Sequence, residues 1–143
     1  LKLARNTIVS PANSFGLMDG GIDEQYTSFF GEGVQEEIQR LINLRSKRFL
    51  PVGSAVLIKT GHKDIPFMIS APTMESPGPV SFENSFFSMA AILKKAFQHR
   101  DIITSVYCPG LGTGTGKIPP NNAAKEMAYA YEKWKKKYIE RFK

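Results

Sequence analysis

The sequence is poor in residues that cross-link a fold or bind metal ions. It has one cysteine, Cys108, so no internal disulfide can form and no cysteine cluster exists for zinc. Its two histidines, His62 and His99, lie far apart and outside metal-ligand spacing. No run reaches the roughly 18–20 apolar residues of a membrane span, and residues 1–7 have no signal-peptide core. We therefore expect a protein of a reducing compartment, the cytoplasm, with no metal, no cofactor and no membrane contact.

The overall composition is that of a globular domain. Hydrophobic residues make up 42% and charged residues 22% of the 143 positions, close to the average for folded proteins. These fractions exclude an intrinsically disordered chain. The length favours one domain over residues 1–143, with a core of its own.

Positive charge is concentrated at the C-terminal end. The net charge is +6, and residues 125–143 hold seven basic residues against three glutamates. Such a segment could attract nucleic acid or an anionic membrane. The alternative, which we favour, is a solvated helix face with lysines near its C-terminus. Tyr131, Trp134 and Tyr138 fall on the apolar stripe of this helix, so we expect them in the core and expect no nucleic-acid partner.

Strand and helix patterns alternate along the chain. Four β-branched or apolar runs predict strands at 7–10, 54–60, 66–71 and 102–108. Helical spacing predicts helices at 23–31, 34–45, 83–99 and from 120 onward. On the helix at 34–45, one face holds Val34, Ile38, Leu41 and Arg45. Two apolar stripes are expected to face the core: Phe86, Met89, Ala90, Leu93, Ala96, Phe97; and Ala124, Met127, Tyr131, Trp134, Tyr138, Phe142. The class is α/β, with helices covering the sheet.

A glycine-rich loop at 109–119 follows the last predicted strand and precedes a helix. In α/β sheets ligands bind at the carboxyl ends of strands, where backbone amides and helix N-termini face outward. A diphosphate is the natural occupant of such a loop. The loop does not match a Walker A motif, because Leu111 stands at the position of its first glycine and Ile118 at the position of its Ser or Thr. The dinucleotide pattern GxGxxG also fails, and the alternative is a plain glycine-rich turn.

A second loop, 11–22, separates Asn13 from Asp23 by ten residues. An amide can hold sugar hydroxyls, and a carboxylate can hold or activate water. The alternative for Asp23 is a residue that satisfies free amides at a helix N-terminus.

Both loops resemble those of the macro domain family. Residues 8–23 read IVSPANSFGLMDGGID, close to the family's first ligand loop, roughly IVNAANxxLxGGGVD. Residues 109–119 read PGLGTGTGKIP, similar to its second loop, roughly PAISTGIYGYP. The strand at 66–71 also lies where the family has one that ends near the ligand. The resemblance implies a three-layer α/β/α fold with a mixed central sheet, and ADP-ribose or a derivative as partner.

The resemblance also implies roles for single residues. Asn13 would hold the distal ribose, and Asp23 would help to activate water at its anomeric carbon, so these two are the candidate catalytic residues. The candidate ligand-binding residues are Ser14, Gly20, Gly21, Ile22, Pro72, Gly110, Leu111, Gly112, Thr113, Gly114, Thr115 and Gly116. Some members of the family hydrolyse ADP-ribosyl esters. The other function implied is a non-catalytic sensor of an ADP-ribose-derived signal nucleotide that controls an attached effector.

This chain departs from the family pattern at three places. Gly116 stands where the family commonly has an aromatic residue, which we expect to open the distal site. Met18 and Asp19 replace glycines, and we expect them to crowd the catalytic end. The family's adenine-selecting aspartate would lie upstream of Asn6, so its first strands are expected to be absent here, as in a fragment of a longer protein with an upstream domain.

Overall fold

A mixed four-stranded sheet forms the centre of the molecule. The computed structural model describes residues 3–18, 21–75 and 78–139. The strands are β1 (Thr7–Ser10), β2 (Val56–Lys59), β3 (Phe67–Ser70) and β4 (Val106–Tyr107), in the order β2-β3-β1-β4. Strand β1 is parallel to β3 and β4, whereas β2 and β3 form an antiparallel hairpin. All four predicted strands are present, so the mixed α/β sheet is confirmed.

The last strand is shorter than the sequence indicated. Residues 102–108 form a ladder with β1 only at Val106–Tyr107. The side chain of Asn6, a residue with φ of 69°, takes over the pairing before that point. Its amide group accepts from the Thr104 backbone N–H and donates to the Ile102 carbonyl, at 3.0 and 3.2 Å. Asparagine tolerates this left-handed conformation better than most residues, so it can replace a strand pairing here.

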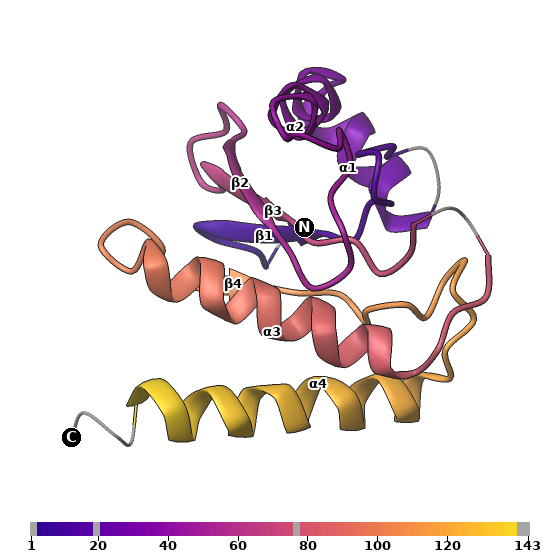
Figure 1. Ribbon diagram of the computed structural model, residues 1–143. Helices are drawn as coiled ribbons and strands as arrows, with labels where there is room; N and C mark the ends of the chain where they lie inside the picture. Colours follow the sequence, from indigo (N-terminus) through magenta and orange to yellow (C-terminus); the bar gives the residue numbers. More distant parts are fainter. Residues whose placement is uncertain (1–2, 19–20, 76–77, 140–143) are drawn as a thin grey trace.

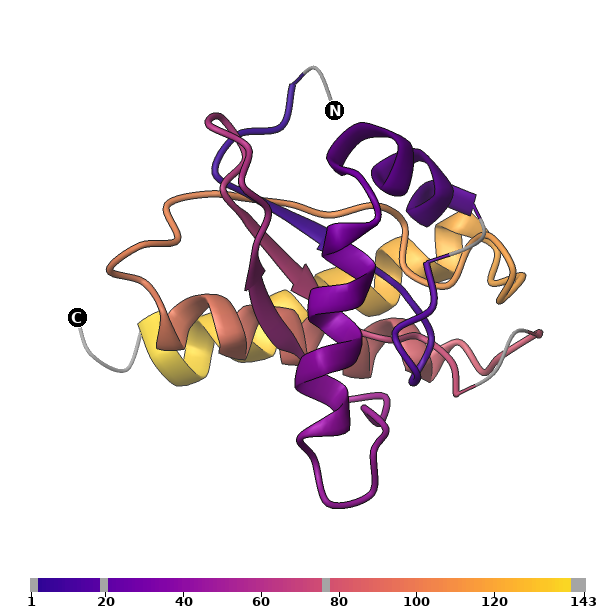
Figure 2. The same ribbon diagram turned by 90° about the horizontal axis from the view of Figure 1, so that it is seen from above.

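Helices cover both faces of the sheet and give three layers. Helices α1 (Gly21–Phe30) and α2 (Gly33–Asn43) lie on one face, and α3 (Glu83–Gln98) and α4 (Pro120–Trp134) lie on the other (Figure 1). Seen from above, α2 runs at a steep angle to α3 and α4 (Figure 2). A π-helical turn, Lys135–Ile139, continues α4. The predicted three-layer α/β/α architecture is confirmed.

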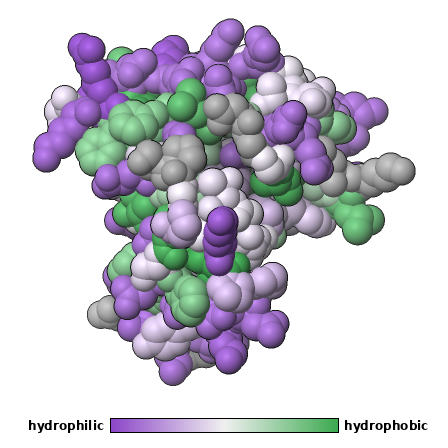
Figure 3. Space-filling model, turned by 90° about the vertical axis from the view of Figure 1, so that its right-hand side faces the viewer, coloured by the Kyte–Doolittle hydropathy of each residue, from purple (hydrophilic) through white to green (hydrophobic). Residues whose placement is uncertain are grey.

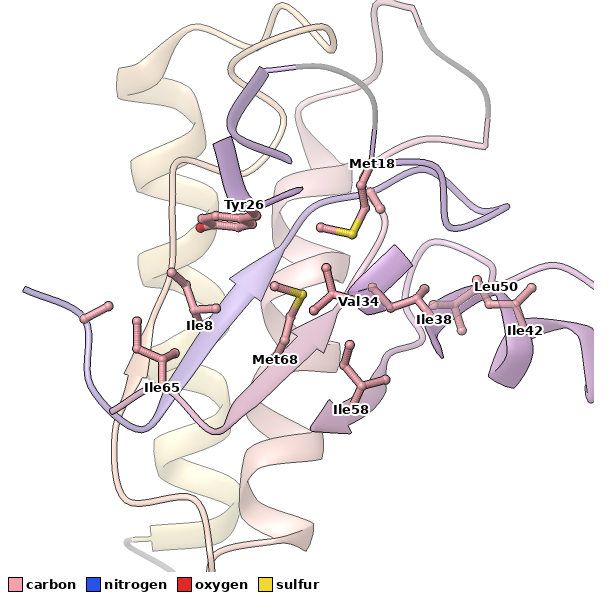
Figure 4. Packing of buried hydrophobic residues seen from close by; sticks show 12 residues of the cluster. Ile8, Met18, Tyr26, Val34, Ile38, Ile42, Leu50, Ile58, Ile65 and Met68 are labelled. Carbon is pink, nitrogen blue, oxygen red and sulfur yellow. The ribbon is translucent and has the colours of Figure 1, made fainter. Parts of the chain in front are cut away.

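Alternate residues of β1 enter two separate cores, as strand geometry requires. Ile8 packs toward α1 and α2 with Tyr26, Ile38 and Met68 (Figure 4). Val9 packs toward α3 and α4 in a second cluster. Ser10, one step further, therefore faces the same side as Ile8.

The predicted apolar stripe of α3 is not its most buried face. The buried residues of α3 are Ser85, Ser88, Ala91 and Ile92, whereas the predicted stripe is only half buried. Helix α3 has two neighbours, the sheet and α4, so its apolar periodicity does not select one buried face. The two serines are buried because they hold loops: Ser85 Oγ donates to the Leu111 carbonyl and Ser88 Oγ to the Pro72 carbonyl, both at 2.6 Å.

The stripe predicted for α4 is wrong in part. Ala123 and Ala130 are its buried residues, while Ala124 is exposed and Tyr131 is 43% exposed. Two other members, Trp134 and Tyr138, are half buried against the ring of Phe97, with centroid distances of 6.0 and 5.1 Å. Small alanines allow α4 to approach its neighbour, which turns the larger residues to the edge of the contact. Phe142 lies outside the described residues.

The stripe of α2 is closer to the prediction. Val34 and Ile38 are buried as expected, Leu41 is half buried, and Ile42 is buried in addition. Arg45 lies beyond the end of the helix at Asn43. Within the described part of the chain, no helix is both long and apolar enough to cross a membrane.

Candidate functional site

The two loops meet at the carboxyl ends of β1, β3 and β4 and enclose a cleft of about 260 Å³. On the face that carries both loops, pale and green side chains lie across the middle, interrupted by a hydrophilic one, and hydrophilic side chains gather above and below (Figure 3). Strand ends and helix N-termini converge there because the three strands are parallel. The residues that line the cleft are Pro11, Asn13, Leu17, Gly21, Ile22, Asp23, Thr73, Met74, Pro109, Gly110, Gly112, Thr113, Gly114, Thr115 and Gly116.

Most of the predicted site residues therefore lie around one cleft. Three others do not line it: Ser14, Pro72 and Leu111. Each is buried and supplies a hydrogen bond to the fold; Ser14 Oγ donates to the Met74 carbonyl at 3.2 Å. The carbonyls of Pro72 and Leu111 accept from α3 as described above. Their ligand contacts stay predictions, and Gly20 and Asp19 lie outside the described residues.

Sequence reasoning missed the lining residues Pro11, Leu17, Thr73, Met74 and Pro109. Thr73 and Met74 follow β3, whose carboxyl end lies beside that of β1. The rule that ligands bind at strand ends could have found them, because a third strand end was already expected here.

Met18 does not crowd the cleft, contrary to the expectation. Its side chain is 2% exposed and packs in the core beneath α1 and α2 (Figure 4). Its backbone N–H donates to Gln35 Oε1 of α2 at 2.6 Å. A long apolar side chain gains more by entering this core than by lining a polar cleft.

Asn13 shapes the first loop as well as lining the cleft. Its Oδ1 accepts from the backbone N–H groups of Phe15 and Leu17, at 3.0 and 3.2 Å. This is the turn-forming behaviour typical of asparagine. Because the loop amides occupy Oδ1, Nδ2 is the polar atom of this side chain that remains to donate a hydrogen bond to a ligand.

Asp23 lies in the first turn of α1 and at the wall of the cleft, 6% exposed. Its Oδ1 accepts from Ser10 Oγ at 2.6 Å. A hydroxyl donated to a carboxylate forms a short, strong hydrogen bond. The helix N-terminus favours the negative charge as well. The two interpretations of Asp23, helix-terminal residue and cleft residue, thus describe the same position.

One protonated group, Tyr26, interacts with this carboxylate, and a second, Cys108, interacts with Tyr26. Burial, followed by the charge of Asp23 and the thiol of Cys108, raises the pKa of Tyr26 above its usual value. Burial alone raises the pKa of Cys108 to about 12. Both groups are neutral at pH 7 and neither lines the cleft, where Asp23 is the ionisable side chain among the described residues.

The cleft offers backbone amides rather than basic side chains to an anion. No lysine or arginine is among the described lining residues, but the first turn of α1 and the glycines of the second loop are. Amides at a helix N-terminus and in a glycine-rich loop bind phosphate without a positive side chain. Across residues 3–18, 21–75 and 78–139, no group of three or more His, Cys, Asp or Glu residues gathers to hold a metal ion.

The comparisons with known proteins agree with this arrangement. The Macro domain family matches residues 9–127. An uncharacterized protein of Aquifex aeolicus is 36% identical over 137 residues, 95% of this chain and 78% of that protein.

Two solved structures show the shared fold. A mutant macrodomain of Oceanobacillus iheyensis solved with ADPR is 20% identical, with a TM-score of 0.76 over 89% of this chain and 69% of its own. The Trypanosoma brucei macrodomain in complex with ADP-ribose is 18% identical, with a TM-score of 0.73 over 94% of this chain and 53% of its own. At these identities the likeness shows the fold. Together with the family match, it establishes that this chain belongs to the macro domain family.

Proposed function

We propose that the cleft binds ADP-ribose or a nucleotide derived from it, and that the protein hydrolyses an ADP-ribosyl ester or a related bond. The observation that carries this proposal is that Asn13, Asp23 and two glycine-bearing loops meet at one cleft. Comparison with other proteins supports the proposal as well, because structures of two similar macrodomains contain ADPR or ADP-ribose.

In this proposal the diphosphate binds to backbone amides. Gly112–Thr115 approach it from one side and the first turn of α1, Gly21 and Ile22, from the other. The distal ribose then lies nearest Asn13 and Asp23. This order keeps the Asp23 carboxylate beside uncharged sugar hydroxyls and away from like-charged phosphates, which it would repel.

In the hydrolytic step, Asp23 acts as the general base. The carboxylate orients a water and takes a proton as the water oxygen bonds to the anomeric carbon of the distal ribose. The bond from that carbon to the ester oxygen breaks, and the carboxylate of the modified side chain leaves. Proton transfer of this kind contributes about 10²- to 10⁴-fold to a rate.

The second candidate is a sensor that binds the nucleotide and leaves it intact. One observation favours it: Asp23 is almost fully buried and hydrogen-bonded to Ser10, as expected of a carboxylate that holds the fold together. A sensor predicts binding with no product formed.

Two measurements test the proposal in sequence. Calorimetric titration with ADP-ribose, with ADP and ATP as controls, should show saturable binding selective for ADP-ribose. A peptide carrying ester-linked ADP-ribose should then release ADP-ribose, and Asp23→Ala should slow this by about 100-fold or more. Asp101→Ala, at an exposed site away from the cleft, is the control.

The outcomes separate the candidates. Turnover lost in Asp23→Ala and kept in Asp101→Ala supports the hydrolase. Binding without turnover by the unaltered chain supports the sensor. Absence of both ADP-ribose binding and ester turnover by folded protein would overturn the hydrolase and restrict the sensor to a modified ADP-ribose.

A further inference from the structure

Ser10 is held rigidly at the end of β1. It pairs in register with Ser70 of β3, and its carbonyl accepts from the Ala71 backbone N–H at 3.0 Å. The residue is fully buried and faces the α1 side of the sheet, as Ile8 does. A side chain on such a strand end has little freedom, so its hydroxyl is a fixed donor.

That hydroxyl meets the one carboxylate found among the described residues of the cleft wall. Ser10 Oγ donates to Asp23 Oδ1 over 2.6 Å, between two segments 13 residues apart in the chain. Both partners are buried, with Asp23 6% exposed. A buried carboxylate needs such a donor, because water does not solvate it there.

The neighbouring strand carries the same residue in the same place without this contact. Ser70 is the last residue of β3, is fully buried and faces the same side as Met68 and Ile8. Its Oγ has no hydrogen-bond partner within the described part of the chain. Two matched serines thus end adjacent strands, and the one on β1 meets the carboxylate.

We propose that Ser10 is the positioning residue of Asp23: its hydrogen bond sets the orientation of the carboxylate against the distal ribose and the attacking water. This inference rests on the proposed function, because the orientation matters only where Asp23 contacts a ligand. Tyr26, whose raised pKa reflects burial and the charge of Asp23, is neutral at pH 7, so it adds no second negative charge beside this carboxylate.

The experiment compares Ser10→Ala with Ser70→Ala, which removes the same atom from the same kind of site. For ADP-ribosyl ester hydrolysis, Ser10→Ala should lower kcat about 10- to 100-fold, the range for one hydrogen bond to a charged group, with KM within about threefold. Ser70→Ala should leave both constants unchanged, and Ser10→Thr, which retains the hydroxyl, should recover most of the rate. Thermal unfolding of each variant reports on folding.

A second readout does not depend on turnover. The Asp23 carboxyl carbon is titrated by NMR in the unaltered chain and in both alanine variants. Loss of the donated hydroxyl should raise the pKa of Asp23 in Ser10→Ala, because hydrogen bonds to the charged form favour ionisation. Ser70→Ala should titrate as the unaltered chain does.

The two proposals fail in different ways. If no ester is hydrolysed but the pKa of Asp23 rises in Ser10→Ala alone, the hydrolase is rejected and Ser10 still positions Asp23. If Ser10→Ala and Ser70→Ala match each other in kcat and in the titration, Ser10 is structural and this inference is overturned, whatever the wild-type turnover.

Discussion

Gly116 lies directly against the backbone of Gly112 across the second loop. A Cβ at Gly116 would stand 2.7 Å from the Gly112 carbonyl oxygen and 3.0 Å from Cγ2 of Val80. The same carbonyl accepts from the Ile118 N–H at 2.9 Å, which closes the loop. The sequence suggested that a glycine here opens the distal site. The structure gives it a further role, since the glycine allows the loop to close upon itself.

Substitution of Gly116 should therefore open the loop. We expect Gly116→Ala to lower the free energy of unfolding by about 1–3 kcal/mol, as overpacking does, and to weaken ADP-ribose binding. Gly114→Ala is the control for the unfolding measurement, because a Cβ there meets nothing within 4 Å. Urea unfolding and calorimetry measure the two effects. Equal behaviour of the two variants would contradict the contact.

Gln35 should act as a clamp on the first loop. Its Oε1 accepts from the Met18 N–H, so Gln35→Ala leaves a partly buried donor without its acceptor. We expect a loss of about 1 kcal/mol in stability and a raised Kd for ADP-ribose, because the loop that carries Asn13 loosens. Gln39→Ala, one turn further along α2, removes the same side chain without this bond. A Kd unchanged in Gln35→Ala would argue against the clamp.

Cys108 should make the fold sensitive to alkali. Its pKa is about 12 in the folded protein against the ordinary 9.0, so the unfolded chain loses this proton first as the pH rises. Stability should fall between about pH 9 and 12, by at most about 1.4 kcal/mol per pH unit from this group. Tyr26, whose pKa is also raised, adds to the loss above pH 10.

Urea unfolding at pH 8 to 11 checks this slope. Cys108→Ala should flatten it and Tyr26→Phe should flatten its upper part. A slope unaltered in both variants would show that other groups govern the alkaline limb.

The side chain of Ile38 should contribute strongly to stability in the core under the first loop. It is fully buried, and its Cγ2 lies 3.0 Å from where a Cβ on Gly16 would stand. We expect Ile38→Ala to cost about 2–5 kcal/mol in unfolding free energy, the range for buried aliphatic truncation. Ile102→Ala, at a residue 39% exposed, should change stability by less than about 0.5 kcal/mol. A small effect at Ile38 would mean that the core relaxes around the cavity.

Much of the fold was predictable because its signals are local. The β-branched run at 7–10, the strand between Pro66 and Pro72 and the glycine after Phe30 each act through a few neighbouring residues. The two loops were predictable for the same reason, since glycines and an asparagine that follow a strand are recognisable without knowledge of the rest.

The buried faces of α3 and α4 were not predictable in this way. A helix with one neighbour shows its buried face in its periodicity, but α3 has two, and α4 meets its neighbour through alanines. The sequence pattern therefore pointed to Tyr131, which the tertiary structure leaves exposed.

The sequence by itself determined which segments become strands, helices and loops, and which residues are available at the strand ends. Only the tertiary structure decided that Ser10, and not Ser70, meets Asp23. The physical reason is that the two serines are equivalent in local pattern. Their difference arises from where α1 crosses the sheet, and the packing of Tyr26 and Ile38 against Ile8 and Met68 sets that position.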